Sequence, residues 1–186
     1  VNSVNGKEKS MAQVLPLVKK YGAAVVGLTL DENGIPATAE ERFNIAKRIV
    51  ERAESLGIDR RDVYIDCLTL TVSAEQKACR QTLEALHRVK TELGCKTVLG
   101  VSNISFGLPN RGLVNSTFLT MALEQGLDLP ILNPNIEVMS GAVRAFRVLS
   151  GYDENANDFV AAYSDAQAPA QTSPKPQGEA DLADAV

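Results

Sequence analysis

Apolar residues along the chain follow two alternating patterns. Short, mostly apolar runs are typical of strands buried on both faces of a parallel sheet, and five such runs occur, at 1–4, 23–28, 62–66, 97–101 and 127–132. After each run, apolar residues recur every three or four positions, which is typical of amphipathic helices. The helices predicted in this way are 7–21, 38–56, 73–93, 113–125 and 136–149.

Two of the predicted helices start with a capping box. In this motif a hydroxyl residue and a Glu or Gln three positions later each satisfy the other's free backbone N–H. Thr38 with Glu41 forms one such pair, and Ser73 with Gln76 forms the other. We therefore expect these helices to begin at Thr38 and Ser73. A glycine follows each of them, which marks the C-terminal end.

The order of the segments is strand then helix, repeated five times. Such alternation predicts an α/β fold with a parallel sheet and right-handed connections. The two architectures of this kind are the open doubly wound sheet and the (β/α)8 barrel. No GxGxxG motif follows a predicted strand, which argues against a dinucleotide-binding sheet. A complete barrel needs about 250 residues, so this chain is short of one by about three units.

The composition changes at Asp165 and divides the chain into three segments. Residues 1–164 have the apolar and charged balance of a folded protein. Residues 165–178 are rich in Ala, Pro and Gln, which predicts a flexible linker. Residues 179–186 return to a helical pattern, and we expect them to begin a following helical domain. A chain that starts without Met and stops in such a pattern is expected to be part of a longer protein.

Charge and cysteine content narrow the classes of function. Residues 1–164 carry nearly equal numbers of basic and acidic side chains, so no electrostatic footprint for nucleic acid is present. No apolar run approaches the roughly 20 residues that a membrane span needs, and no signal peptide is recognised. Three cysteines without a CxxC pair and a single His argue against a metal site and fit a cytoplasmic protein.

Polar residues stand where the predicted strands end. Asn2 and Asp66 directly follow apolar strand residues, and Asn103 follows the strand residue Val101 after Ser102. The C-terminal ends of parallel strands share the face where α/β proteins bind ligands. Asn and Asp are also common at any turn, and Asp31 is predicted to form an Asx-turn. Amides and a carboxylate suit a flat heterocycle with N–H and C=O edges. Only His87 could serve as a histidine base, and it lies on a helix flank.

Four segments resemble a known family: VNSVNG at 1–6, AAVVGLTLDENGIP at 23–36, DVYIDCL at 62–68 and KTVLGVSNISFGLPNR at 96–111. They resemble the pterin-binding methyltransferases, which include methyltetrahydrofolate:corrinoid methyltransferases and the folate domain of cobalamin-dependent methionine synthase. The resemblance covers residues 1–163 and implies a (β/α)8 TIM barrel, with only about its last five βα units present. It implies that 5-methyltetrahydrofolate binds at the C-terminal mouth and gives its N5 methyl group to the Co(I) of a corrinoid on a neighbouring domain or protein.

The resemblance also implies roles for four residues. Asn2 matches an Asn that hydrogen-bonds the pterin ring, and Asp66 matches the carboxylate that holds the amino–imino edge of the ring. Asn103 matches the Asn that reaches N5 and assists its protonation, which makes it the catalytic candidate. Arg111 matches a basic residue near the folate. A further family Asp would lie upstream of Val1, so we expect the isolated chain to bind folate weakly or not at all.

Several alternatives within and outside the family stay open. The predicted linker and following helix favour the multidomain members, in which a corrinoid-binding cap comes next, over a free-standing methyltransferase. The final methyl acceptor, homocysteine or another corrinoid pathway, is not fixed by these residues. Dihydropteroate synthase shares the barrel, but it would need a Ser-Arg-Lys-type signature where this chain has VSNISFG, at 101–107. A non-catalytic module that docks a corrinoid protein is the remaining alternative.

Overall fold

Five strands and six helices alternate along residues 1–164, the part of the chain that the computed structural model describes. The strands are β1 (Asn2–Asn5), β2 (Val25–Leu28), β3 (Val63–Asp66), β4 (Lys96–Gly100) and β5 (Leu129–Ile131). The helices are α1 (Glu8–Tyr21), α2 (Ala39–Ser55), α3 (Ala78–Arg88), α4 (Arg111–Glu124), α5 (Glu137–Leu149) and α6 (Asn157–Tyr163). The linker predicted at 165–178 and the helix predicted at 179–186 lie outside the described residues.

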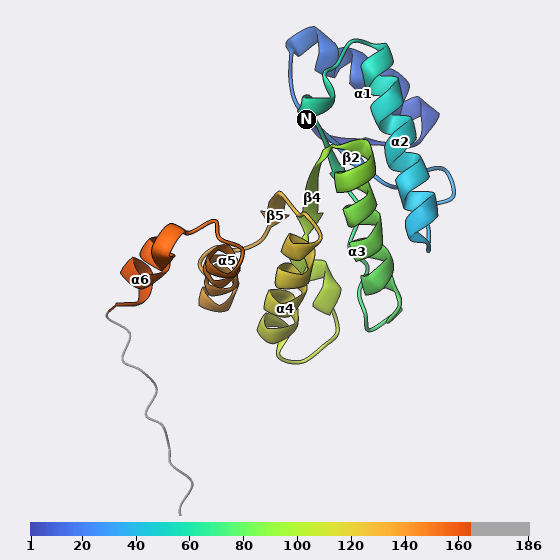
Figure 1. The fold of residues 1–186 in the computed structure, drawn as a ribbon. Coiled ribbons are helices and arrows are strands. Elements are labelled where there is room, and N and C mark those ends of the chain that lie inside the picture. Colours follow the sequence, from blue (N-terminus) through green and yellow to red (C-terminus); the bar gives the residue numbers. More distant parts are fainter. Residues whose placement is uncertain (165–186) are drawn as a thin grey trace, which may run out of the picture.

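The strands form one parallel sheet in the order β1-β2-β3-β4-β5. A doubly wound sheet reverses its strand order part-way across, whereas each strand of a barrel pairs with the next strand along the chain. The sequential order therefore confirms an α/β fold of the barrel type, with five βα units (Figure 1).

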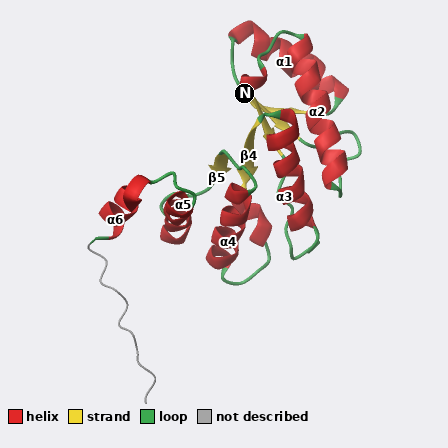
Figure 2. Ribbon diagram, viewed as in Figure 1, coloured by secondary structure: helices red, strands yellow, loops and turns green. Residues whose placement is uncertain are grey.

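One face of the sheet packs against α1 to α4 and forms the hydrophobic core (Figure 2). Val4, Ile65 and Leu99 on this face are fully buried. Gly27 belongs to the same face, because a Cβ there would lie 3.0 Å from Ile49 of α2 and 3.2 Å from Ile65. We call this side of the sheet the helix face, and by strand alternation it comprises Val4, Val25, Gly27, Val63, Ile65, Thr97, Leu99 and Pro130.

The opposite side of the sheet is less covered. Successive strand residues point to opposite faces, so Asp66 points away from α2, toward which Ile65 is directed. Asp66 pairs with Leu28 and Val98, and Val98 pairs with Leu129, which is 47% exposed. We call this side the open face, and it comprises Val26, Leu28, Tyr64, Asp66, Val98, Gly100, Leu129 and Ile131. Asn2 joins it through its pairing with Val26, because the register of β1 shifts between Asn2 and Val4.

The two predicted capping boxes have different outcomes. The Thr38 hydroxyl accepts a hydrogen bond from the Glu41 N–H at 3.3 Å and donates to the Glu41 carboxylate at 2.7 Å, so the cap of α2 forms without the reciprocal backbone bond. The prediction for Ser73 is wrong, because α3 begins at Ala78. Ser73 Oγ donates instead to the carbonyl of Phe106 at 2.7 Å, so a contact between two loops takes its place.

Two further segments differ from the sequence-based expectation. Residues Val101–Ser105, expected to end a strand and begin a loop, form a 3-10 turn directly after β4. The short helix α6 was not expected from the pattern. Its first turn is held by Asp153, whose carboxylate accepts hydrogen bonds from the N–H groups of Asp158 at 3.0 Å and Phe159 at 2.9 Å. Such a cap satisfies N–H groups that a helix start leaves free.

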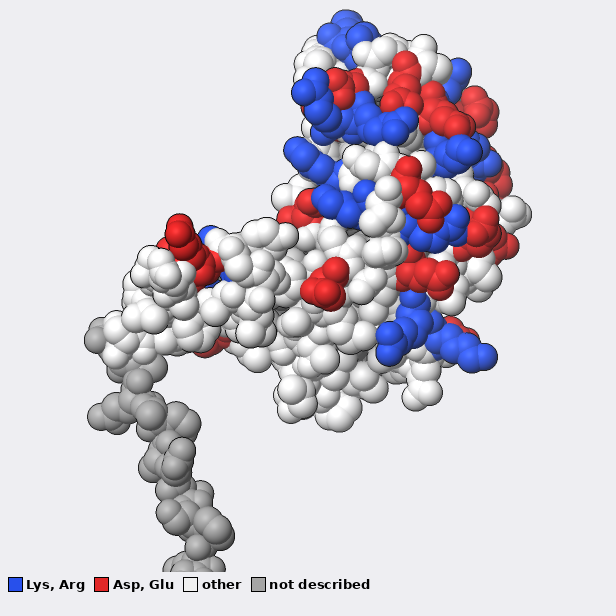
Figure 3. Space-filling view, viewed as in Figure 1, with Lys and Arg blue, Asp and Glu red and all other residues white. Residues whose placement is uncertain are grey.

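Charge is distributed unevenly over the surface. In the view of Figure 3, basic and acidic side chains are interspersed over α1 to α3, while the region over α4 to α6 is mostly uncharged. Helix α5 packs against α4, and the Tyr163 hydroxyl of α6 donates to Glu137 of α5 at 2.7 Å. Within residues 1–164, no helix combines the length and apolar character that crossing a membrane requires.

Candidate functional site

Asp66 is the last residue of β3 and the only carboxylate among the open-face strand residues defined above. Its side chain is 9% exposed, and its Oδ1 accepts a hydrogen bond from the Leu68 N–H at 2.8 Å. Burial raises the pKa of Asp66 to about 6, and the Leu68 N–H, which favours the charged form, offsets part of that rise. Near neutral pH Asp66 is therefore a largely ionised acceptor in a partly desolvated position.

The backbone at Asp66 is fixed from the neighbouring strand. Thr29, which follows β2 and is fully buried, donates to the Asp66 carbonyl through its N–H at 3.0 Å and its hydroxyl at 3.2 Å. These two bonds hold the end of β3 against the end of β2. Thr29 thus uses its polar groups on the protein backbone.

Asn103 lies in the 3-10 turn after β4 and is exposed. Its Nδ2 atom is 3.4 Å from the position that a Cβ on Gly100 would occupy. Gly100 belongs to the open face, because Val98 two residues earlier pairs with Asp66. The amide of Asn103 therefore lies over the face that carries Asp66, and the missing side chain at Gly100 leaves it room.

Arg111, the first residue of α4, supports the turn that carries Asn103. Its Nε donates to Ser105 Oγ at 2.9 Å and its Nη2 donates to the Ser102 carbonyl at 2.9 Å. The guanidinium also lies over the Phe106 ring, 4.6 Å from the ring centre. These contacts bridge the turn on both sides of Asn103, so the partners of Arg111 in this structure belong to the protein. Its contact with folate remains a prediction.

The loop after Asp66 and the turn around Asn103 are joined by hydrogen bonds. The Val72 N–H donates to the Ile104 carbonyl at 3.0 Å. The hydroxyls of Thr71 and Ser73 both donate to the Phe106 carbonyl at 2.7 Å. The structure thus brings together the two loops that follow β3 and β4.

Asn2 occupies a different level of the sheet. Asn2 pairs with Val26 of β2, whereas Asp66 pairs with Leu28, two residues further along the same strand. Asn2 and Asp66 therefore lie at different positions along the strands of the open face. Barrel strands are tilted and staggered, which brings residues from different rungs to one height. Asn2 is exposed, and its side chain has no hydrogen-bond partner within residues 1–164.

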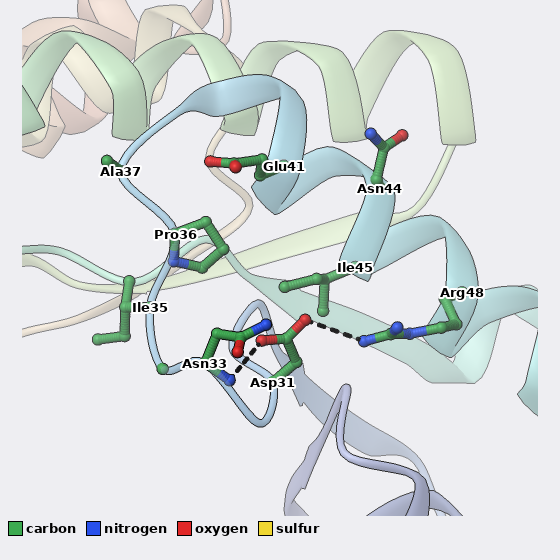
Figure 4. Close-up of a pocket in the computed structure, with 10 residues that line it drawn as sticks. Asp31, Asn33, Ile35, Pro36, Ala37, Glu41, Asn44, Ile45 and Arg48 are labelled. Atoms are coloured by element: carbon green, nitrogen blue, oxygen red, sulfur yellow. Dashed lines mark hydrogen bonds and ion pairs between the residues drawn. The ribbon is translucent and has the colours of Figure 1, made fainter.

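A pocket of about 510 Å³ lies beside the loop after β2, and its polar groups are largely engaged (Figure 4). The Asp31 carboxylate accepts a hydrogen bond from the Asn33 N–H at 2.9 Å, and its Oδ2 lies 3.4 Å from Nη2 of Arg48 on α2. The Asx-turn predicted for Asp31 is confirmed. Glu41, on the pocket wall, holds Thr38. The described part of the chain contains no group of three or more His, Cys, Asp or Glu side chains that could hold a metal ion.

Comparison with protein families identifies the fold family. The family described as "Pterin binding enzyme" matches residues 1–133, which include Asn2, Asp66, Asn103 and Arg111. The chain belongs to the pterin-binding enzyme family. This confirms the resemblance that the four sequence segments carry, and it agrees with the sequential order of the parallel sheet.

Curated proteins similar to this chain include two methionine synthases and a methyltransferase. Methionine synthase of Mycobacterium leprae is 39% identical over 146 residues, which are 72% of this chain and 12% of that protein. Methionine synthase of Mycobacterium tuberculosis has the same identity and coverage. Methylcorrinoid:tetrahydrofolate methyltransferase of Eubacterium limosum is 30% identical over 168 residues, 88% of this chain and 61% of that protein. The chain therefore spans less than two thirds of the length of each of these relatives.

Sequence reasoning missed one residue of this region, Arg42 of α2. Its guanidinium is fully buried and donates to the carbonyls of Cys67 and Leu68, which directly follow Asp66. The sequence did contain a signal for its burial. Arg42 stands four residues before Ala46 and seven before Ile49, both buried, so it lies on the apolar stripe of its helix.

Proposed function

We propose that this chain forms the pterin-binding part of a methyltransferase that transfers a methyl group between N5 of tetrahydrofolate and the cobalt of a corrinoid. The observation that carries the proposal is the placement of the Asp66 carboxylate and the Asn103 amide over one face of the sheet. The family match and the names of the relatives support it. The corrinoid would be held by a neighbouring domain or protein and would supply the cobalt.

Asp66 has the chemistry to hold the amino–imino edge of a pterin. Each carboxylate oxygen accepts more than one hydrogen bond, so Oδ1 can keep the Leu68 N–H and Oδ2 remains available. A pterin presents an amino group and a ring N–H side by side, which match the two oxygens of an ionised carboxylate. Hydrogen bonds to an ionised acceptor are about twice as strong as neutral ones. Asp66 would thereby orient the ring and fix the position of N5.

Asn103 has the chemistry to act at N5. N5 of 5-methyltetrahydrofolate is a tertiary amine; when its bond to the methyl group breaks, the electron pair stays on N5, which takes up a proton from solvent and leaves as the secondary amine of tetrahydrofolate. The amide N–H of Asn103 would donate a hydrogen bond to N5 and assist its protonation. This bond accelerates the reaction because it is stronger in the transition state than in the bound substrate. Asn2 would hold the ring from the opposite side of the mouth, and Arg111 would keep the turn of Asn103 in place.

The direction of transfer separates two versions of the proposal. We favour transfer from 5-methyltetrahydrofolate to Co(I), as part of methionine synthesis from homocysteine, because the two methionine synthases share 39% identity with the chain. The name of the Eubacterium limosum relative, 30% identical, gives methylcorrinoid as donor and tetrahydrofolate as acceptor. A free-standing methyltransferase with that direction is the second version. The same residues would serve both directions, because a reversible step uses one transition state.

The test is methyl transfer by the full-length protein that contains this chain. Wild-type protein is mixed with 5-methyltetrahydrofolate and free Co(I) cobalamin, and loss of the Co(I) absorbance is followed. We expect Asn103→Ala to lower the rate by about a hundredfold, the size of losing a transition-state hydrogen-bond donor. Asn44→Ala, at an exposed position of α2, is the matched control and should leave the rate unchanged.

Two results would contradict the proposal. Equal rates for wild type and Asn103→Ala would remove Asn103 from the catalytic role. No transfer in either direction by the wild-type protein, with folate and cobalamin both present, would favour a non-catalytic module that docks a corrinoid protein.

A further inference from the structure

Arg42 is an arginine buried without a carboxylate partner. Its side chain is fully buried on α2, and no ion pair to it occurs among residues 1–164. Burial lowers its pKa below the ordinary value for arginine, and its Nη2 atom has no hydrogen-bond partner in the described structure. Burying a charge in this way is costly. A residue in such a position needs a compensating role.

Three of the four hydrogen bonds of Arg42 lie around the turn after Asp66, and the fourth runs from its Nε to the Pro36 carbonyl at 2.8 Å. Its Nη1 donates to the carbonyl of Cys67 at 3.1 Å and to the carbonyl of Leu68 at 3.0 Å. The same Nη1 donates to the Thr82 hydroxyl of α3 at 2.8 Å, and that hydroxyl donates to the Leu68 carbonyl at 3.2 Å. The guanidinium and Thr82 together therefore hold the two peptide groups that directly follow the candidate pterin carboxylate.

Leu68 has a backbone conformation that requires such support. Its φ angle is +61°, in the left-handed region, which is disfavoured for a residue with a Cβ. In this conformation its N–H donates to Asp66 Oδ1 at 2.8 Å. That hydrogen bond fixes the orientation of the carboxylate.

We propose that Arg42 is a positioning residue of the pterin site, which clamps the turn 66–68 so that the Leu68 N–H holds the Asp66 carboxylate in its binding orientation. This inference rests on the proposed function, because the Asp66 carboxylate is taken as the group that binds the pterin. Arg42 itself is too deeply buried to touch a ligand. Thr82 is the second member of the clamp.

The clamp acts by holding the backbone of residues 66–68 in place. The ionisable group next to Asp66 in the chain is the Cys67 thiol, whose pKa is raised by its burial, so it stays uncharged. Burial raises the pKa of Asp66 and the hydrogen bond from the Leu68 N–H lowers it, so a change in that hydrogen bond would be seen in the titration of Asp66. Lysine at position 42 would keep the charge, but its nitrogen ends one bond short of Nη1, and it has no second nitrogen to replace the Nε bond to the Pro36 carbonyl. Arg42→Lys should therefore behave like a loss of the clamp.

The first experiment needs no folate. The Asp66 carboxyl is titrated by carbon-detected NMR in wild type, Arg42→Lys, Arg42→Met and Thr82→Val, with Arg52→Met on the exposed side of α2 as the control. We expect a wild-type midpoint near pH 6. The clamp variants should titrate higher by about half a unit to one unit, because the carboxylate loses a hydrogen bond that favours its charged form. An unchanged or lower midpoint in all three clamp variants overturns the inference.

The second experiment measures the dissociation constant of 5-methyltetrahydrofolate for the full-length protein. Arg42→Met should weaken binding by about tenfold or more, as misplacement of a binding group does. Thr82→Val should have a smaller effect in the same direction, and Arg52→Met should bind like wild type. If Arg42→Met does not fold, Thr82→Val and Arg42→Lys decide the test. A purely structural arginine would lower the melting temperature while the titration midpoint and the affinity of the folded protein stay unchanged.

The two proposals fail in different ways. If wild type does not bind the folate at all, the proposed function fails, and the positioning role fails with it. If wild type binds but Arg42→Met and Thr82→Val bind equally well, only the positioning role is overturned.

Discussion

The helix face and the open face of the sheet are built from the same five strands, but they differ in almost every physical property. Val4, Val63, Ile65 and Leu99 on the helix face are fully buried against α1 to α4. On the open face, Ile131 is 53% exposed and Asp66 is the one carboxylate of the strands' open-face set. Because successive strand residues point to opposite faces, one residue packs into the core while its neighbour is available to contact a ligand.

The difference explains how a polar site can exist in an apolar fold. Side chains on the helix face are held by close packing, so they fix the backbone of each strand. The open face can then present polar groups whose positions depend on that backbone and on the loops beyond it. Three predictions compare the two faces, from the largest expected effect to the smallest.

The largest expected effect is on stability at the helix face. Ile65→Ala should lower the free energy of unfolding by about 2–5 kcal/mol, because it leaves a cavity in the core between β3 and α2. The matched control is Ile131→Ala on the open face, which should lower it by less than about 1 kcal/mol. Urea denaturation of both variants measures the two values. Equal losses would remove the distinction between the faces.

The glycines give the second comparison. Gly27→Ala places a Cβ 3.0 Å from Ile49 and 3.2 Å from Ile65, so overpacking should lower the free energy of unfolding by about 1–3 kcal/mol. Gly100→Ala places a Cβ 3.4 Å from Asn103 Nδ2, an ordinary contact distance at an exposed turn. It should leave the melting temperature nearly unchanged and slow methyl transfer. The reverse pattern, an inactive Gly27→Ala and an unstable Gly100→Ala, would contradict the assignment of the faces.

The third prediction concerns the free-energy cost of keeping a carboxylate on the open face. The pKa of Asp66 rises from 3.8 unfolded to about 6 folded. The unfolded chain therefore loses this proton first, and the stability of the protein falls as pH rises from about 4 to about 6. Asp66→Asn should raise the free energy of unfolding at pH 7 by about 1–3 kcal/mol.

Below about pH 4 the advantage of Asp66→Asn should disappear, because Asp66 is then protonated in both states. Thermal unfolding at pH 7 and pH 3.5 measures both values. A variant that is less stable than wild type at pH 7 would mean that the carboxylate is stabilising and that its burial has no cost.

The sequence predicted the alternation of strands and helices because short apolar runs and three-to-four spacing report directly on burial. It also placed Asp66 and Asn103 at strand ends. It could not predict contacts between segments far apart in the chain. Ser73 has the local signature of a helix cap, but its hydroxyl binds the Phe106 carbonyl, 33 residues away.

Arg42 is a second residue whose contacts with a distant segment could not be predicted from the sequence. Its position on an apolar stripe conflicts with its charge, and the structure satisfies the guanidinium partly through carbonyls of the loop after β3, 25 and 26 residues further on. The sheet order, which separates a barrel from a doubly wound sheet, is likewise a property of pairing between strands. The roles of Asn2, Asp66, Asn103 and Arg111 at a pterin remain predictions that a ligand must test.

The pH dependence of folate binding tests most directly the claim that the open face binds a pterin through Asp66. The dissociation constant of 5-methyltetrahydrofolate for the full-length protein is measured by titration calorimetry between pH 5 and pH 8, for wild type and Asp66→Asn. We predict that wild-type affinity is constant above the pKa of about 6 and falls below it as the carboxylate takes up a proton, whereas Asp66→Asn binds weakly at every pH. Wild-type affinity that is the same at pH 5 and pH 8, or an Asp66→Asn variant that binds like wild type, would contradict the account.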